Sequence, residues 1–506
     1  MEVTATTPGR LILAAAIASL FATVATPALA DTETLLDKLH EKGVLSDEEY
    51  QEMRTEARAD RRAQALKEAK EDEKKQQPPG DTGKVKISES IKSVELYGDL
   101  RLRYEDRIGK SNAPSVGAAS GTPLVTPDAI DRQRWRYALR LGIRGDASEN
   151  FFYGLRLDTS TNPRSPWVTF GDDSLLGPGP SARNSDGISV GQAFVGWRAT
   201  DWLTIQAGKG PNLLMTSPMV WDPDISPEGL TERINYKVND SFTAFATFGQ
   251  WMYQDFNPDN TTSSSLGYNK QDLLMYAWEV GAQYKISDSS SLRGAVNYYT
   301  YSGGKNSGFN ATFTGQPTVT ANGNFNNPAN QIGVNDLSVI EVPLEFKFPL
   351  SRYSAMLYGN IAKNLDGANR ATRAGKSAYG DQDMAYQAGF SIGSAGLTYG
   401  PTQGPVYGTT AKKGTWEART YMQRVEQYAL DPNLLDSDFF EGRTNMQGYY
   451  LAFAYTPVDA LITTVRYGQG KWYNQALGTG GDNPDLAALN PITDWKILQF
   501  DLTLRF

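Results

Sequence analysis

Residues 132–144 read Arg-Gln-Arg-Trp-Arg-Tyr-Ala-Leu-Arg-Leu-Gly-Ile-Arg, so apolar and polar side chains alternate with a period of two. One face carries Trp135, Tyr137, Leu139, Leu141 and Ile143, and the other carries Arg134, Arg136, Arg140 and Arg144. Because successive side chains of a β-strand point to opposite faces, this pattern predicts a strand with one apolar and one cationic face. Such a strand, taken alone, fits either a soluble sandwich or a closed barrel.

The same alternation recurs from about residue 93 to the end of the chain. In the first such stretch Val94, Leu96, Leu100, Leu102 and Tyr104 alternate with Glu95, Tyr97, Asp99, Arg101, Arg103 and Glu105. We predict sixteen strands, at residues 93–106, 132–146, 151–159, 187–198, 202–209, 229–238, 240–251, 272–285, 290–302, 335–348, 352–364, 384–398, 413–426, 446–457, 460–468 and 495–506.

The connections between these strands favour the barrel, because they alternate between short and long. The short ones include residues 146–150, 199–201, 239, 286–289 and 457–459. The long ones, rich in Gly, Asn, Ser and Asp, include 107–131, 160–186, 252–271, 303–334 and 469–494. Outer-membrane barrels have tight periplasmic turns and long external loops. We therefore predict an all-β membrane protein, an antiparallel transmembrane β-barrel of about 16 strands, although the connection 399–412 is longer than this scheme expects.

The amino-terminal part has a different character. Arg10, the apolar residues that follow it and the small residues Ala28 and Ala30 predict a secretory signal peptide at residues 1–30. A transmembrane anchor is the alternative, but Pro27 at its end suits cleavage better.

Residues 31–75 have helical periodicity, and their high charge leaves open whether they form a coiled coil or a solvated extension. We predict a periplasmic helical segment at 31–75, a linker at 76–92 and the barrel at 93–506.

Composition excludes several kinds of chemistry. The chain has 506 residues, a formal charge of -8, no cysteine and one histidine, His40. It therefore lacks disulfides, thiolate metal sites and a histidine cluster, and a catalytic triad has only His40 to use. A mildly acidic chain also lacks the basic face that nucleic-acid binding requires. We predict no enzymatic activity, no metal, no cofactor and no nucleic-acid partner.

The carboxy-terminal strand gives a separate indication of the same architecture. Leu498, Phe500, Leu502, Leu504 and Phe506 alternate with polar residues, and Phe506 is the last residue of the sequence. A final strand that ends in an aromatic residue resembles the signal by which bacterial outer-membrane barrels engage their assembly machinery. We expect Phe506 to serve as that signal.

Several motifs resemble the Putative porin family of Gram-negative outer membranes, and the overall plan has a weaker similarity to phosphate-selective porins. The motifs are residues 208–212 (Gly-Lys-Gly-Pro-Asn), 220–229 (Val-Trp-Asp-Pro-Asp-Ile-Ser-Pro-Glu-Gly), 414–416 (Gly-Thr-Trp), 435–439 (Leu-Asp-Ser-Asp-Phe) and 444–445 (Thr-Asn), with the family's start at 35–46. The resemblance implies a pore for small solutes or ions in the outer membrane, embedded in its lipid, and a homotrimer.

The resemblance also implies that the third external loop, residues 209–228, folds inward and narrows the channel. The expected constriction comprises Lys209, Trp221, Asp222, Asp224 and Glu228 on this loop, and Arg101, Arg103, Arg134, Arg136, Arg140, Arg144, Arg156 and Arg198 on the wall. Arginine ladders in a low-dielectric wall favour anions. The alternative is that these arginines pair with lumen carboxylates such as Glu95, Asp99 and Asp158 and brace the barrel.

We therefore expect a water-filled channel for passive diffusion of small hydrophilic solutes or ions, with a modest anion or mixed preference. A barrel scaffold or conduit that tethers the cell wall or sheathes a partner protein is the alternative function.

Overall fold

The computed structural model describes residues 90–111, 129–160, 165–171, 187–255, 272–302, 334, 336–395, 411–479 and 491–506. The chain divides into two compact units, Met1–Thr82 and Gly83–Phe506, and every described residue belongs to the second. The expected signal peptide, the expected helical segment at 31–75 and most of the expected linker lie outside the described residues. These three assignments therefore stay predictions.

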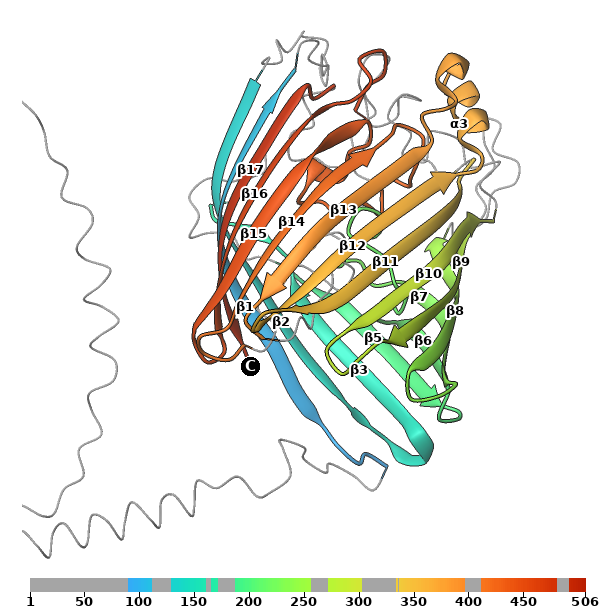
Figure 1. Ribbon diagram of the computed structural model, residues 1–506, viewed down its shortest axis with the longest axis vertical. Coiled ribbons are helices and arrows are strands. Elements are labelled where there is room, and N and C mark those ends of the chain that lie inside the picture. The colour runs from blue at the N-terminus through green and yellow to red at the C-terminus, as the bar shows by residue number, and fades with distance from the viewer. Residues whose placement is uncertain are drawn as a thin grey trace, which may run out of the picture. The chain divides into compact units, whose positions relative to one another are not determined.

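The second unit is one closed antiparallel sheet (Figure 1). Its described part has sixteen long strands: β1 (Glu95–Lys110), β2 (Ala129–Asp146), β3 (Phe151–Thr159), β5 (Ile188–Arg198), β6 (Leu203–Lys209), β7 (Glu228–Lys237), β8 (Phe242–Gln254), β9 (Leu273–Lys285), β10 (Ser291–Tyr301), β11 (Ser338–Leu350), β12 (Tyr353–Asn364), β13 (Met384–Gly393), β14 (Trp416–Val425), β15 (Met446–Val458), β16 (Leu461–Trp472) and β17 (Asp494–Arg505). The two-residue strand β4 (Val168–Thr169) pairs with β2 beyond the end of β3.

The first and last strands close the barrel. β1 pairs with β17 from Asp99 opposite Arg505 to Lys110 opposite Asp494. The terminal residue extends this pairing, because Phe506 and Gly98 exchange two backbone hydrogen bonds of 2.9 and 3.1 Å. A single closed sheet excludes the sandwich of two sheets. It confirms the predicted architecture and strand number, and each predicted strand corresponds in order to one long strand.

Alternate residues of each strand face inside and outside. In β1, Arg101, Arg103, Glu105 and Arg107 are buried, whereas Leu100 and Leu102 are 39% and 41% exposed. The same holds for β2, where Arg134, Arg136 and Arg140 are buried and Trp135 is exposed. The polar face of each strand therefore points into the barrel and the apolar face points outward, which is the reverse of a soluble protein.

The strand connections segregate by length to the two ends of the barrel. Residues 147–150, 199–202, 238–241, 286–290, 351–352 and 459–460 form tight turns at what we call the short-turn end. Ser351 and Ala460 adopt positive φ values of 57° and 66° there. The connection 394–415 at this end is longer, as the sequence indicated, and its residues 396–410 lie outside the described part.

The other end, which we call the long-loop end, carries the long connections and the helix α3 (Gly367–Arg373). Short 3-10 helices cover Ser377–Tyr379 and Phe440–Gly442 in these long connections, and Ser148–Asn150 in a tight turn at the short-turn end. None of the helices in the described segments is long and apolar enough to cross a membrane.

Candidate functional site

Two of the long connections fold into the barrel. We call residues 210–227, between β6 and β7, the first inner loop, and residues 426–445, between β14 and β15, the second inner loop. Most of their residues are buried, among them Met215, Trp221, Leu430 and Phe440. Both loops contact side chains at inward-facing strand positions, so they occupy the lumen.

The first inner loop extends from β6 and β7 to the wall formed by β10, β11 and β12. Asn297 of β10 donates a hydrogen bond to the carbonyl oxygen of Met215 at 2.7 Å. Asn360 of β12 donates to Ser217 Oγ at 2.6 Å, and Thr216 Oγ1 donates to Glu341 of β11 at 2.8 Å. The inward fold that the family resemblance implied is therefore present.

Glu341 is the central acceptor of this anchor. Its buried carboxylate accepts hydrogen bonds from Thr216, Asn297, Tyr299 and Asn360. Four donors on one carboxylate leave its oxygens well satisfied, although no cation lies within ion-pair distance among the contacts of the described residues. The tip of the first inner loop is thus held by hydrogen bonds rather than by an ion pair.

The second inner loop spans the lumen between two other parts of the wall. The carboxylate of Asp431 accepts hydrogen bonds from Tyr253 of β8 at 2.7 Å and Tyr301 of β10 at 2.9 Å. The carboxylate of Asp438 lies 3.1 Å from donors of Arg103 and Arg107 in β1. This loop therefore ties the sheet closure at β1 to strands near the middle of the sequence.

The two inner loops bind each other where they meet. The backbone N–H of Asp436 donates to the carbonyl oxygen of Pro218 at 3.1 Å. The N–H of Ser437 donates to the Asp222 carboxylate at 3.1 Å, and the N–H of Asp222 donates to the carbonyl oxygen of Leu434. Asp222 therefore joins the two loops, and that it also lines a pore stays a prediction.

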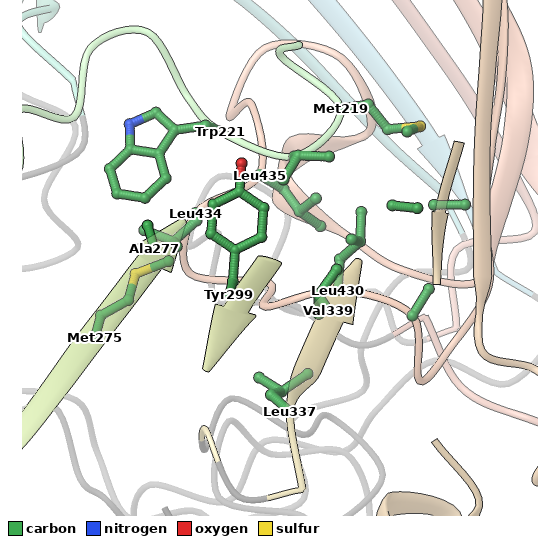
Figure 2. Packing of buried hydrophobic residues seen from close by; sticks show 14 of the residues in the cluster. Met219, Trp221, Met275, Ala277, Tyr299, Leu337, Val339, Leu430, Leu434 and Leu435 are labelled. Carbon is green, nitrogen blue, oxygen red and sulfur yellow. The ribbon is translucent and has the colours of Figure 1, made fainter. Parts of the chain in front are cut away.

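An apolar cluster fills the space beside this junction (Figure 2). Trp221, Met219, Leu434 and Leu435 from the loops pack with residues of β9, β10 and β11, including Tyr299. Trp221 also meets Trp251 edge-on, with ring centroids 5.4 Å apart. Burial of this much apolar surface inside a barrel whose wall is polar fixes both loops in place.

Two inward glycines of β16 make room for the second inner loop. The rings of Phe439 and Phe440 are stacked with centroids 4.0 Å apart. A Cβ at Gly468 would lie 2.8 Å from the Phe439 ring, and a Cβ at Gly470 would lie 2.5 Å from the Phe440 ring. Sequence reasoning did not identify this contact, although two glycines two residues apart on one strand face were a usable signal.

The structure brings most of the predicted arginines together on β1, β2 and β3, with an acidic partner for each. Arg101 pairs with Asp99, Arg134 and Arg136 lie near Glu105, Arg140 pairs with Asp224, and Arg156 pairs with Asp158. Arg103 binds both Asp501 and Asp438. We call this set the arginine wall. Its pairing is the bracing arrangement that the sequence left open as an alternative.

The remaining predicted residues lie apart from the arginine wall. Arg144 and Arg198 are more than half exposed at the short-turn end, where they pair with Glu95 and Asp146. Lys209 and Glu228 pair at 2.9 Å where the first inner loop leaves and rejoins the sheet. That these residues line or narrow a pore stays a prediction.

Several residues that form ion pairs with or beside the arginine wall were not predicted from the sequence. Arg107, Arg466, Asp438, Glu441 and Asp501 take part in its ion pairs. Asp438 belongs to the 435–439 motif, which the sequence did reveal. Its ion-pair partner Arg103 lies 335 residues away in β1, and no pattern in the sequence indicated this pairing.

The enclosed carboxyl groups of the loops respond differently to their surroundings. Burial raises the pKa of Asp224, but the neighbouring guanidinium groups of Arg140 and Arg101 outweigh it, so the pKa lies below its usual range. Within the described part of the chain, no cation forms an ion pair with the Asp436 carboxylate. Burial and then the nearby Asp438 raise the pKa of Asp436 to about 7. The junction of the two loops thus holds a carboxyl group that titrates near neutral pH.

Replacement of Glu341 tests the anchor of the first inner loop. Glu341→Ala removes an acceptor that four buried donors share, and Thr216 and Tyr299 lose the acceptor of their hydroxyl groups. We expect it to lower the free energy of unfolding by about 2–4 kcal/mol. Thermal or urea unfolding in detergent measures this loss. Asp288→Ala removes a fully exposed acid and should leave stability nearly unchanged. Equal effects of the two replacements would contradict the anchoring role.

The raised pKa of Asp436 predicts a pH-dependent stability. The folded protein binds this proton more tightly than the unfolded chain, whose carboxyl titrates near 3.8, so stability should fall as pH rises from about 4 to about 7. Thermal unfolding of the native protein and of Asp436→Asn at several pH values measures the effect. The Asn variant should lose this component of the slope. An identical pH profile for both proteins would refute the assignment.

Comparison with known proteins gives the family. The family model described as Putative porin matches residues 83–341 and 342–506. No curated protein matches the chain.

Among solved structures, a double mutant of Rh. blastica porin is 12% identical, with 82% of this chain and 100% of that chain covered and a TM-score of 0.36. A triple mutant of Rhodopseudomonas blastica porin has the same identity and coverage and a TM-score of 0.35. Since the family model covers nearly all of the second unit, the chain belongs to the Putative porin family.

Proposed function

We propose that this protein is an outer-membrane porin that lets small hydrophilic solutes or ions diffuse passively through its lumen. The observation that carries the proposal is the closed sheet with an apolar outer face and a polar inner face, crossed by two inner loops. A closed barrel satisfies every strand's backbone hydrogen bonds in lipid while its lumen stays wetted. We further propose that the long-loop end faces the outside of the cell and that the amino-terminal segment lies in the periplasm.

The narrowest passage would run between the arginine wall and the inner loops. The side chains of Asp99, Asp224 and Asp438 keep 15%, 12% and 20% of their surface accessible there, so solvent still reaches the paired charges. Fixed charges on both sides would impose a field across a passing ion.

Pairing of the arginines with carboxylates makes the expected selectivity modest. Each member of the arginine wall has an acidic neighbour, which cancels most of the potential that unpaired arginines would create. We propose a weak anion preference, because the guanidinium groups of Arg140, Arg101 and Arg156 together outweigh burial at the loop carboxylate of Asp224. The preference is weak because Arg101 and Arg156 also pair with Asp99 and Asp158. The homotrimer and the contact with the barrel assembly machinery belong to the same proposal.

Planar-bilayer recording of the full protein tests the channel. We expect stable conductance and, in a KCl gradient, a small reversal potential of the sign that indicates anion preference. Asp224→Asn should shift selectivity toward anions and Arg140→Gln toward cations, each by about twofold, since one charge about 8 Å from an ion in water contributes roughly 0.5 kcal/mol.

Asp288→Asn, at an exposed turn, is the control and should leave selectivity unchanged. Absence of conductance in the intact protein would contradict the porin assignment and favour a scaffold. Strong cation selectivity would contradict the anion preference alone.

A further inference from the structure

A groove of about 1000 Å³ lies on the outer surface of the barrel, over strands β11 to β16 and the start of β17. Most of its lining comes from outward-facing positions such as Leu344, Ile361 and Met422, and Met422 is 70% exposed. None of the described residues that line it belongs to either inner loop, so the groove is separate from the lumen.

The strand register places the groove near the long-loop end. One row of paired residues runs across the sheet through Ile361, Tyr386, Arg424, Gln447 and Lys471. The next row toward the middle of the strands passes through Gly359, Ala388, Met422, Tyr449 and Gln469. Figure 1 shows these strands side by side. The groove thus follows two adjacent rows of outward side chains.

The two halves of the groove differ in chemistry. Over β11 to β13 it is apolar, with Val342, Leu344 and Ile361 around the small residues Gly359 and Ala388. Over β14 to β16 it contains the two cations, Arg424 and Lys471, with Gln447 and Gln469, beside the apolar side chains of Met422 and Tyr449. An amphiphile with an acyl chain and an anionic head would match this division.

Arg424 and Lys471 are suited to bind an anion. Neither has an acidic partner within 4.0 Å in the described part of the chain, although Asp494 lines the groove beside Lys471 and Glu426 follows Arg424 closely. The Arg424 guanidinium lies 4.4 Å from the ring centroid of Tyr473 and donates to its hydroxyl at 3.3 Å, which holds it at the rim. Arg424 and Lys471 lie in the same row on β14 and β16, with β15 between them, so their backbones are about 10 Å apart. Both side chains are long enough to reach one phosphate group across this distance.

We propose that this outer groove binds a phosphorylated, multiply acylated lipid of the outer leaflet, with a phosphate on Arg424 and Lys471 and an acyl chain against Val342, Leu344 and Ile361. Phosphate oxygens accept charge-assisted hydrogen bonds from both cations. The apolar half would hold the acyl chain by van der Waals contact with Val342, Leu344 and Ile361. The placement in the outer leaflet rests on the proposed function, since it requires the long-loop end to be external.

Native mass spectrometry of the full protein in detergent, titrated with hexa-acylated diphosphoryl lipid A, tests the proposal. Arg424→Gln with Lys471→Gln should weaken binding about tenfold or more, to the level of the dephosphorylated lipid. Lys237→Gln with Lys285→Gln is the matched control, because these lysines are exposed at the short-turn end. The control should bind like the native protein.

Gly359→Leu tests the apolar half without disturbing the fold. A Cβ there meets only the Gln387 carbonyl oxygen, at 3.5 Å, so the added side chain occupies the groove. It should weaken binding of both the phosphorylated and the dephosphorylated lipid.

Unchanged lipid binding in the charge variant and in Gly359→Leu would overturn the proposal. If Gly359→Leu changes only the oligomeric state seen in the same spectra, the groove is a contact between copies of this chain, which also overturns it. Conductance of the same variants separates this proposal from the porin assignment. A conducting protein with unaltered lipid binding refutes the lipid site alone, and a lipid-binding protein without conductance refutes the channel alone.

Discussion

Backbone hydrogen bonding across a closed sheet is the constraint on which the rest of this structure depends. A strand in lipid has no water to satisfy its N–H and C=O groups, so the last strand must pair with the first. Here β17 pairs with β1 along twelve residues, and Phe506 continues the pairing at Gly98. Closure then requires each strand to present one face outward and one to the lumen, which sets the period of two along the described strands.

The same closure explains why the charges of the lumen are paired. Arginines that face inward are enclosed by the wall and by the inner loops, and an enclosed charge without a partner would be costly. Asp438 of the second inner loop and Asp224 of the first supply carboxylates to Arg103 and Arg140. The loops therefore neutralise the wall that surrounds them, and the proposed selectivity would depend on small local imbalances rather than on a free ladder of arginines.

The fold could be predicted from the sequence to a large extent, and the site only in part. Each strand is a local pattern, so all sixteen were found, with errors of a few residues at their ends, as where β16 continues to Trp472. The inner-loop anchors are not local. Thr216 and Glu341 are 125 residues apart in sequence, and Arg103 and Asp438 are 335 residues apart. No local pattern in the sequence predicts either contact. The first inner loop was expected from family resemblance, whereas the second became apparent only from its contacts.

Because the outer and inner faces of the sheet are separate, two neighbouring residues of one strand can have different roles. In β12, Gly359 borders the outer groove, while Asn360, the next residue, donates to Ser217 of the first inner loop. Because adjacent side chains of a strand point to opposite sides, a change at one position leaves the other in place. Selection can therefore adjust the outer surface and the lumen independently along one strand. This independence is what would allow one barrel wall to carry the proposed passage on the inside and the proposed lipid contact on the outside.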